Sequence, residues 1–151
     1  TLLEKPSFQT LVSRNRCVVI SDGYYEWKRE GKRKIPHYIF SQDRELLPMA
    51  GLWSSWTGPE GDTQNTYTVI TTEARTTVRT IHHRMPVILN EDTYQNWLNT
   101  EDVSVTDALF LLQPYAGDIS THPVSTLVNS PKNNSSVCIQ SVDNRETLDL
   151  F

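Results

Sequence analysis

Residues 16–27 read RCVVISDGYYEW, and this stretch decides the fold class. It is rich in β-branched and aromatic residues, which favour extended backbone, so it predicts a strand. The polar, Gly-containing run KREGKRK at 28–34 predicts a turn, and HYIFS at 37–41 predicts the returning strand. The sequence therefore predicts a β-hairpin near the start of the chain.

Further strands are predicted downstream of this hairpin. The segments at 48–56 and 66–72 have strand composition, and turn residues at 58–61 separate them. The Met85-Pro86 step disfavours helix at Met85, and we expect a short strand at 87–89.

Helices are expected only late in the chain. Asn90 predicts the cap of a helix that runs to about Leu98, and Thr106 the cap of a second helix through Leu112, which Pro114 stops. The tail predicts short strands and loops. The expected fold class is α+β, built mainly on antiparallel strands. The strand order does not follow from the sequence.

Composition excludes several classes of protein. The 151 residues are 37% hydrophobic and 21% charged, which is typical of one soluble globular domain. No apolar run is long enough to span a bilayer. The formal charge is −4, but residues 1–40 hold 8 basic and 4 acidic residues. This part can present a positive face to an anion, or it is simply a solvated basic hairpin.

The chain lacks the common cofactor and disulfide signatures. Its two cysteines, Cys17 and Cys138, form neither a disulfide framework nor a zinc site, and we expect a reducing compartment. No GxSxG, P-loop, GxGxxG or HExxH motif is present.

The first candidate site is the run DGYYEW at 22–27. On a strand, Tyr24 and Glu26 share one face while Tyr25 and Trp27 share the other. A Glu among aromatic rings is partly desolvated and suits general acid–base work. The alternative is an exposed Glu26 that pairs with Lys28 or a neighbouring Arg.

The second candidate site is IHHRMP at 81–86. His82 can move protons near neutral pH, and Arg84 can hold a phosphate or a carboxylate. On an extended stretch these two side chains would point to the same side. The alternative is a surface loop or a structural His. Adjacent histidines alone do not make a metal site.

The tryptophans are a third group. Trp97 is expected in the core, whereas Trp53 and Trp56 flank a turn, where they are either partly exposed or, as is more common for such rings, part of the core. Aromatic rings near cations can stack on unpaired bases, although most such rings belong to a core.

Six segments in order give the chain a specific resemblance. DGYYEW, the basic hairpin, MAGLW, YTVITTEA, IHHRMPVIL and VSTLVNSPKNN together resemble the SOS-response-associated-peptidase (SRAP) family from about Glu4 to Asp143. The last two forms look most similar to the animal members, which process abasic sites and are described as binding 5-hydroxymethylcytosine. The resemblance implies a barrel-like β-sheet with a few short helices, in a single domain over residues 1–151.

The resemblance also implies a reaction. Family members recognise abasic sites in single-stranded DNA, and their N-terminal Cys forms a Schiff base and then a thiazolidine with the sugar aldehyde. Glu26 and His82 match the catalytic Glu and His of the family. Arg84 matches the Arg that holds a phosphate, Trp27 the aromatic that packs on the DNA, and Thr71 a further phosphate contact. Neither metal nor organic cofactor is implied.

One departure from the family pattern matters. The family begins Met-Cys-Gly-Arg and also uses an Asn and an Arg ahead of the position of Thr1, and this chain lacks all of these. We therefore expect a fragment that makes no crosslink alone. The competing hypotheses are an autoprocessing peptidase without a DNA role and a non-catalytic binder of single-stranded or modified DNA.

The expected partners and compartment follow from the same resemblance. They are single-stranded DNA with abasic sites and replication-fork proteins, with no membrane. The expected location is the nucleus of a eukaryote or the cytoplasm of a bacterium.

Overall fold

The computed structural model describes residue 2 and residues 6–142 of the chain. The chain divides into two compact units, which are described separately below. The first unit comprises Thr1–Ser21, Leu47–Thr72 and Pro86–Tyr115, and the second comprises Asp22–Leu46, Glu73–Met85 and Ala116–Phe151. The ends of the predicted domain, at 1, 3–5 and 143–151, lie outside the described residues. No helix in the described part is long and apolar enough to cross a membrane.

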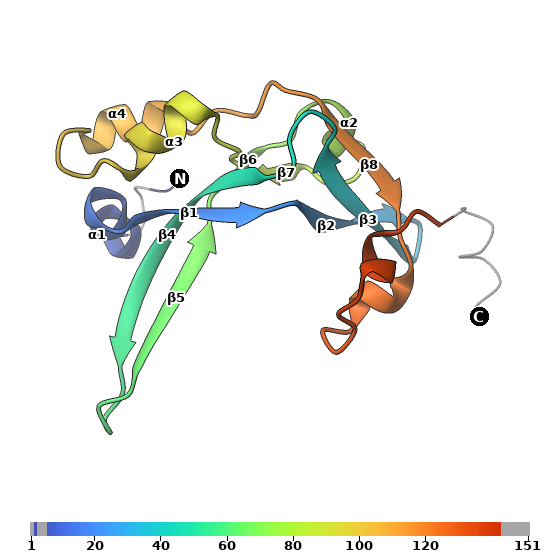
Figure 1. The fold of residues 1–151 in the computed structure, drawn as a ribbon, viewed down its shortest axis with the longest axis horizontal. Coiled ribbons are helices and arrows are strands. Elements are labelled where there is room, and N and C mark those ends of the chain that lie inside the picture. Colours follow the sequence, from blue (N-terminus) through green and yellow to red (C-terminus); the bar gives the residue numbers. More distant parts are fainter. Residues whose placement is uncertain (1, 3–5, 143–151) are drawn as a thin grey trace. The chain divides into compact units, whose positions relative to one another are not determined.

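An antiparallel sheet forms the base of the first unit. Its strands are β1 (Arg16–Ser21), β4 (Leu47–Thr57) and β5 (Thr63–Val69), in the order β1-β4-β5. Gly51 of the central strand β4 pairs with Cys17 of β1 on one side and with Val69 of β5 on the other. Figure 1 shows β4 and β5 as one long hairpin.

Three helices belong to the first unit: α1 (Pro6–Arg14), α3 (Glu91–Leu98) and α4 (Val105–Phe110). The predicted cap of α3 is confirmed, because the Asn90 side chain accepts from the Thr93 backbone N–H at 2.9 Å. The predicted cap of α4 at Thr106 is wrong.

Both ends of α4 differ from the prediction, and one helix was missed. Ser104 caps α4, since its hydroxyl accepts from the Asp107 N–H at 3.1 Å and also donates to the Asp107 carboxylate at 2.7 Å. The helix ends at Phe110, before the predicted Leu112. α1 was not predicted, although Phe8, Leu11 and Val12 follow helical spacing after a Pro at the first position.

The sheet and the helices of this unit pack around one hydrophobic core. Trp97 is fully buried, as expected, and its indole N–H donates to the Cys17 carbonyl at 2.8 Å. The buried members of the cluster are Val12, Ala50, Leu52, Ile70, Val87, Leu89, Trp97 and Ala108.

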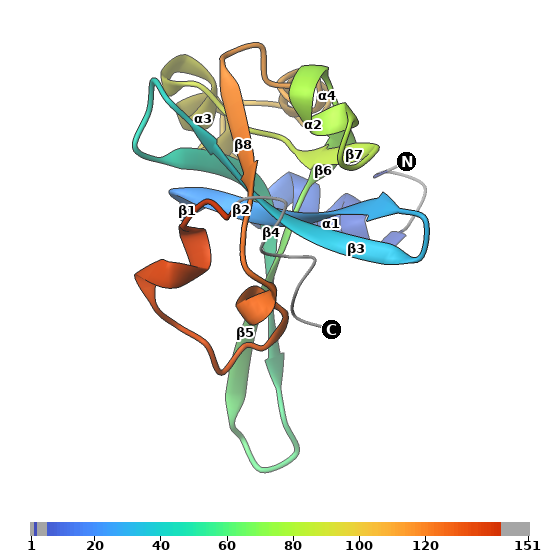
Figure 2. The ribbon, with the colours of Figure 1, turned by 90° about the vertical axis from the view of Figure 1, so that its right-hand side faces the viewer.

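A second antiparallel sheet forms the base of the second unit (Figure 2). Its strands are β2 (Gly23–Glu30), β3 (Arg33–Ser41) and β8 (Ile119–Pro123), in the order β2-β3-β8. The predicted single strand over 16–27 is therefore split at Asp22 between the two sheets.

The β2–β3 turn is shorter than the predicted 28–34. Only Gly31 and Lys32 connect the paired residues Glu30 and Arg33. Gly31 has φ of +63°, a conformation that glycine adopts without strain, and a two-residue turn needs it. The polar residues on either side therefore remain in the strands.

Aromatic side chains cover one face of this second sheet. Tyr38 contacts the rings of Tyr25, Phe40 and His122 at centroid distances of 5.5–5.9 Å. A Cβ on Gly23 would lie 2.5 Å from ring atoms of Tyr38. The glycine of DGYYEW thus makes room for a buried ring.

The shorter elements revise two predicted strands. The strand expected at 66–72 is β5 followed by β6 (Thr71–Glu73), with Ile70 between them. The strand expected at 87–89 is instead β7 (Arg84–Pro86), which pairs with β6, while Ile88 forms an isolated β-bridge. Residues 87–89 do not pair with one strand, because the Val87 N–H donates to the Ile70 carbonyl and the Leu89 N–H to the Pro48 carbonyl.

The remaining elements lie in the second unit. They are α2 (Thr76–Arg79) and the 3-10 helices η2 (Thr126–Asn129) and η3 (Ser136–Ile139). The predicted α+β class with antiparallel sheets and few helices is confirmed. The barrel-like closure is not found among the described residues, where the sheets are open and have three, three and two strands. The single-domain prediction stays a prediction.

Candidate functional site

Glu26 lies in the middle of β2, an edge strand of the second sheet. Strand alternation puts Tyr24 and Glu26 on one face and Tyr25 and Trp27 on the other, as predicted. Burial, and then the charge of Glu26, raise the pKa of Tyr24 above its ordinary value. Its hydroxyl is buried and has no hydrogen-bond partner among the described residues.

The loop after α2 brings His82 to Glu26. The stretch is a turn at this point and not extended, because the His82 backbone N–H donates to the Val78 carbonyl at 2.9 Å. His82 Nδ1 lies 3.7 Å from Glu26 Oε1. That separation is too long for a hydrogen bond. The two side chains form an ion pair when the imidazole is protonated.

The backbone of Arg84 fixes the ring of His82. Nδ1 lies 3.1 Å from the Arg84 carbonyl oxygen and 3.2 Å from the Arg84 backbone nitrogen. Nδ1 can therefore donate to the carbonyl when protonated, or accept from the N–H when not. Nε2 makes no hydrogen bond within the described part of the chain, and the His82 side chain is 37% exposed. Nε2 is the nitrogen left for a reactant.

The predicted phosphate contacts, Arg84 and Thr71, lie on β7 and β6. Arg84 begins β7 with an exposed side chain, in the same unit as Glu26. Thr71 is exposed at the start of β6, in the first unit. The structure thus brings Glu26 and His82 together, and the phosphate roles stay predictions.

Trp27 is hydrogen-bonded to a residue that is distant in the sequence. Its indole N–H donates to the Asn129 side-chain oxygen at 2.8 Å. Asn129 ends η2, and Asn133 Nδ2 donates to the Leu127 carbonyl at 2.8 Å, which ties the following loop back to η2. Both asparagines belong to VSTLVNSPKNN, a motif whose residues received no role from the sequence.

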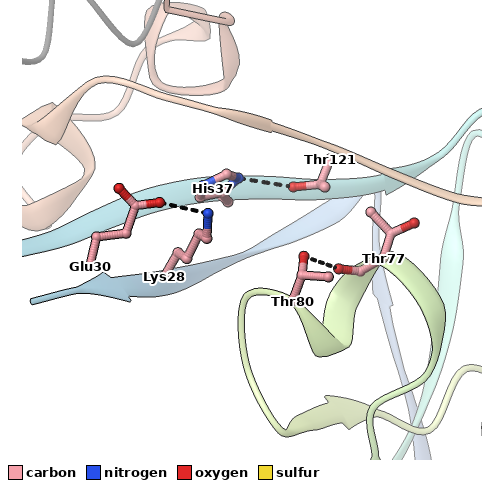
Figure 3. Close-up of polar contacts among 6 residues, drawn as sticks. All are labelled: Lys28, Glu30, His37, Thr77, Thr80 and Thr121. Atoms are coloured by element: carbon pink, nitrogen blue, oxygen red, sulfur yellow. Dashed lines mark hydrogen bonds and ion pairs between the residues drawn. The ribbon is translucent and has the colours of Figure 1, made fainter.

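Sequence reasoning missed His37, the cross-strand partner of Glu26. Directly opposite residues share a face, so His37 lies beside Glu26 on the sheet. His37 Nδ1 lies 3.3 Å from the Thr121 hydroxyl (Figure 3). Burial, and then the charge of Lys28, lower the pKa of His37. The hairpin register would have identified this residue.

The ion pairs on this face differ from the expected alternative. Lys28 Nζ lies 2.6 Å from Glu30 Oε1, so Lys28 pairs with Glu30 and not with Glu26 (Figure 3). The Lys28 contact lowers the pKa of Glu30. Thr77 and Thr80 of the α2 turn also lie in this region (Figure 3).

Other features involve neither residue of this pair. A cavity of about 460 Å³ in the first unit is lined by Trp53 and Tyr67, with Cys17 among its other residues, and contains none of the predicted site residues. Trp53 and Trp56 are 40% and 58% exposed, so the partly exposed alternative holds and the core position favoured for such rings does not. Cys17 and Cys138 are free thiols. Burial raises the pKa of Cys17, which makes it a poor nucleophile. The described residues hold no cluster of three metal-ligating side chains.

Comparison with protein families gives a match over most of the chain. The family described as SOS response associated peptidase (SRAP) matches residues 1–131. The abasic site processing protein YoqW of Bacillus subtilis is 45% identical over 143 residues, which cover 93% of this chain and 64% of YoqW. The abasic site processing protein HMCES of Xenopus tropicalis is 39% identical over 94% of this chain and 48% of that protein.

Solved structures agree with the sequence relatives. A crystal structure of a Bacteroides thetaiotaomicron protein matches with a TM-score of 0.85 and 32% identity, over 94% of this chain and 63% of that one. The chain thus spans about half to two thirds of the length of these similar proteins.

Proposed function

This chain belongs to the SOS response associated peptidase (SRAP) family, and from that membership we propose that its whole protein senses and shields abasic sites in single-stranded DNA through a covalent crosslink. The observation that carries the proposal is the pair of Glu26 and His82, with Oε1 and Nδ1 3.7 Å apart. The two side chains come from the DGYYEW and IHHRMP segments. The names of YoqW and HMCES support the same lesion.

The proposed reaction needs an N-terminal cysteine, which residues 1–151 do not include. The cysteine amine attacks the aldehyde carbon of the ring-opened sugar, and the carbonyl oxygen leaves as water when the C=N bond forms. The sulfur then attacks the same carbon, and the electron pair of the C=N bond returns to nitrogen, which takes up a proton. The five-membered thiazolidine ring that results needs no oxidant or reductant.

Glu26 and His82 supply proton transfer in this scheme. Glu26 takes a proton from the attacking amine and returns one to the departing oxygen. His82, through Nε2, assists the opening of the sugar ring and the formation or reversal of the Schiff base. A carboxylate and an imidazole held side by side can divide acid and base work at one carbon.

The other predicted residues position the DNA in the proposal. Arg84 and Thr71 contact backbone phosphates, which orient the strand without reading its sequence. Trp27 packs against the DNA, with its ring held through Asn129. The proposed chemistry uses neither a metal nor an organic cofactor.

The test is a crosslinking assay with the whole protein that contains this sequence. A single-stranded oligonucleotide with one abasic site should give a heat-stable protein–DNA band, whereas a reduced abasic analogue without an aldehyde should give none. Glu26→Gln and His82→Gln should slow band formation or reversal by about 100-fold or more, with binding largely kept. Absence of any band with the unmodified protein would overturn the proposal.

The same assay separates the competing functions. A non-catalytic binder would retain the oligonucleotide without a covalent band. An autoprocessing peptidase without a DNA role would release its N-terminal residue and show no preference for the lesion. Autoprocessing by the same Glu26 and His82 pair is part of our proposal, because the family description names a peptidase.

We also propose that the chain is of the animal type and forms a single domain over residues 1–151. The whole protein would act with replication-fork proteins, in the nucleus of a eukaryote or the cytoplasm of a bacterium. The similar proteins come from both bacteria and vertebrates.

A further inference from the structure

The β2–β3 hairpin carries an unusual charge arrangement beyond Trp27. Arg29 on β2 and Lys34 on β3 are direct cross-strand partners, and both side chains are exposed. The Cβ atoms of such partners lie about 5 Å apart, and like charges at this separation destabilise a sheet. An anion bound to both side chains would relieve this repulsion.

The opposite face of the hairpin supplies its own counter-charge. There Lys28 pairs with Glu30 at 2.6 Å, and Arg33 is the cross-strand partner of Glu30. Neither Arg29 nor Lys34 has a carboxylate within 4.0 Å among the described residues. One face is therefore partly neutralised, and the other presents two cations without an acid.

The cation pair lies on the same face as Trp27. Arg29 is two residues beyond Trp27 on β2, so their Cα atoms are about 7 Å apart. The indole is fixed by Asn129, and the two-residue turn at Gly31 closes the hairpin soon after the cation pair. The hairpin turn is seen at the right of Figure 2. An aromatic ring and two cations are thus held together on a short, tightly connected element.

We propose that the Trp27, Arg29 and Lys34 face of the hairpin binds the backbone of the single DNA strand that continues beyond the lesion. The proposal rests on the proposed function. A ring beside cations matches single-stranded nucleic acid, whose bases stack while its phosphates pair. The cation pair is three residues from Glu26, about 10 Å along β2. The path of the DNA from one face of β2 to the other is at least this long, so it takes at least about three stacked nucleotides.

The position of β2 allows such a path. Glu26 and Trp27 point to opposite faces, and β2 is an edge strand of the second sheet in the described part of the chain. A strand that leaves the Glu26 face reaches the cation pair by passing around this edge. The contact adds affinity for undamaged flanking DNA and plays no part in the covalent chemistry.

The first test measures the salt dependence of binding to an undamaged single-stranded 20-mer, with the whole protein. Arg29→Gln with Lys34→Gln should lower the slope of log affinity against log salt by about 1.4, the value for two single-strand phosphate contacts. Arg14→Gln with Lys132→Gln removes the same charge from exposed positions outside the hairpin and should leave the slope nearly unchanged. Equal losses in the two double variants would overturn the proposal.

Oligonucleotide length gives a second arm. A trinucleotide with the lesion at its centre does not reach the hairpin, so the unmodified protein and the Arg29/Lys34 variant should bind it equally. A defect that persists with the trinucleotide would contradict the inference. Polyglutamate of matched charge tests whether the surface binds an acidic protein instead. If polyglutamate binds as tightly as DNA, the proposed DNA-binding surface is also overturned.

A third arm separates binding from folding. Lys34→Glu converts the like-charge pair into an opposite-charge pair, so the thermal midpoint should rise without DNA while affinity for the 20-mer falls. A fall of both values would mean that the substitution damages the hairpin, and Lys34→Gln then replaces it in the binding assay. If crosslinking fails but the salt slope changes as expected, the proposed function fails and the binding surface stands. Normal crosslinking with an unchanged slope refutes the surface alone.

Discussion

The indole N–H of Trp27 donates a 2.8 Å hydrogen bond to the side-chain oxygen of Asn129, a residue 102 positions further along the chain. The bond joins β2 to the end of η2 within the second unit. It means that the orientation of a predicted DNA-contacting ring depends on a distant loop. The hydrogen bond thus links the DGYYEW segment to the VSTLVNSPKNN segment, and the second supports the ring of the first.

Asn129→Ala should loosen the Trp27 ring. Loss of the hydrogen bond should lower the free energy of unfolding by about 1 kcal/mol and reduce affinity for single-stranded DNA, with the crosslinking chemistry unchanged. Chemical denaturation and fluorescence anisotropy measure the two effects. Asn134→Ala, at an exposed position in the same motif, is the control and should change neither.

Gly23→Ala should destabilise the second sheet. The new methyl group would lie 2.5 Å from the buried ring of Tyr38, which is stacked among other rings and cannot move freely. We expect a loss of about 1–3 kcal/mol in thermal or urea unfolding. Gly58→Ala also meets a close atom, but that atom ends the exposed Asp62 side chain, which can turn away. A loss at Gly58 as large as that at Gly23 would contradict this explanation.

Trp97→Phe should weaken the core of the first unit. The substitution leaves the Cys17 carbonyl without its donor and opens space in the cluster, so we expect a cost of about 2–3 kcal/mol. Trp56→Phe is the matched control, because Trp56 is 58% exposed, and it should stay within about 0.5 kcal/mol of the unmodified protein. Equal effects of the two substitutions in urea unfolding would show that Trp97 is not a core residue.

His37 should make the protein sensitive to mild acid. Its pKa is below the ordinary 6.5 when folded, owing first to burial and then to Lys28, with His122 adding to the shift and Glu30 opposing it. Below pH 6.5 the unfolded chain therefore binds a proton that the folded chain does not, and stability falls. His37→Gln should reduce the loss of the urea midpoint between pH 7.5 and pH 5.5.

An NMR titration checks the cause of this effect. Lys28→Gln should raise the pKa of His37 part of the way toward its ordinary value, because burial remains. No change in the His37 titration would show that the lysine charge has no influence there.

The sequence predicted what depends on local periodicity. Alternation along DGYYEW separated Glu26 from Trp27, and Asn90 marked the start of α3. The Ser104 cap was also readable, since Asp107 follows it at the spacing of a capped first turn. The prediction at Thr106 failed because it ignored that pair.

The long-range contacts were beyond local reasoning. Nothing near Trp27 in the sequence indicates Asn129, and nothing near Glu26 indicates the 3.7 Å approach of His82. Both depend on how loops fold back on the second sheet. His37 was accessible in principle, because the two-residue turn at Gly31 sets the register that places it opposite Glu26.

The two backbone groups of Arg84 beside His82 have a consequence for turnover. Because a carbonyl and an N–H both lie within 3.2 Å of Nδ1, the ring keeps its plane whichever nitrogen carries the hydrogen. Nε2 can then release a proton in one direction of the reaction and collect one in the other without any rotation of the side chain. The proposed adduct would therefore form and reverse with the His82 imidazole in one orientation.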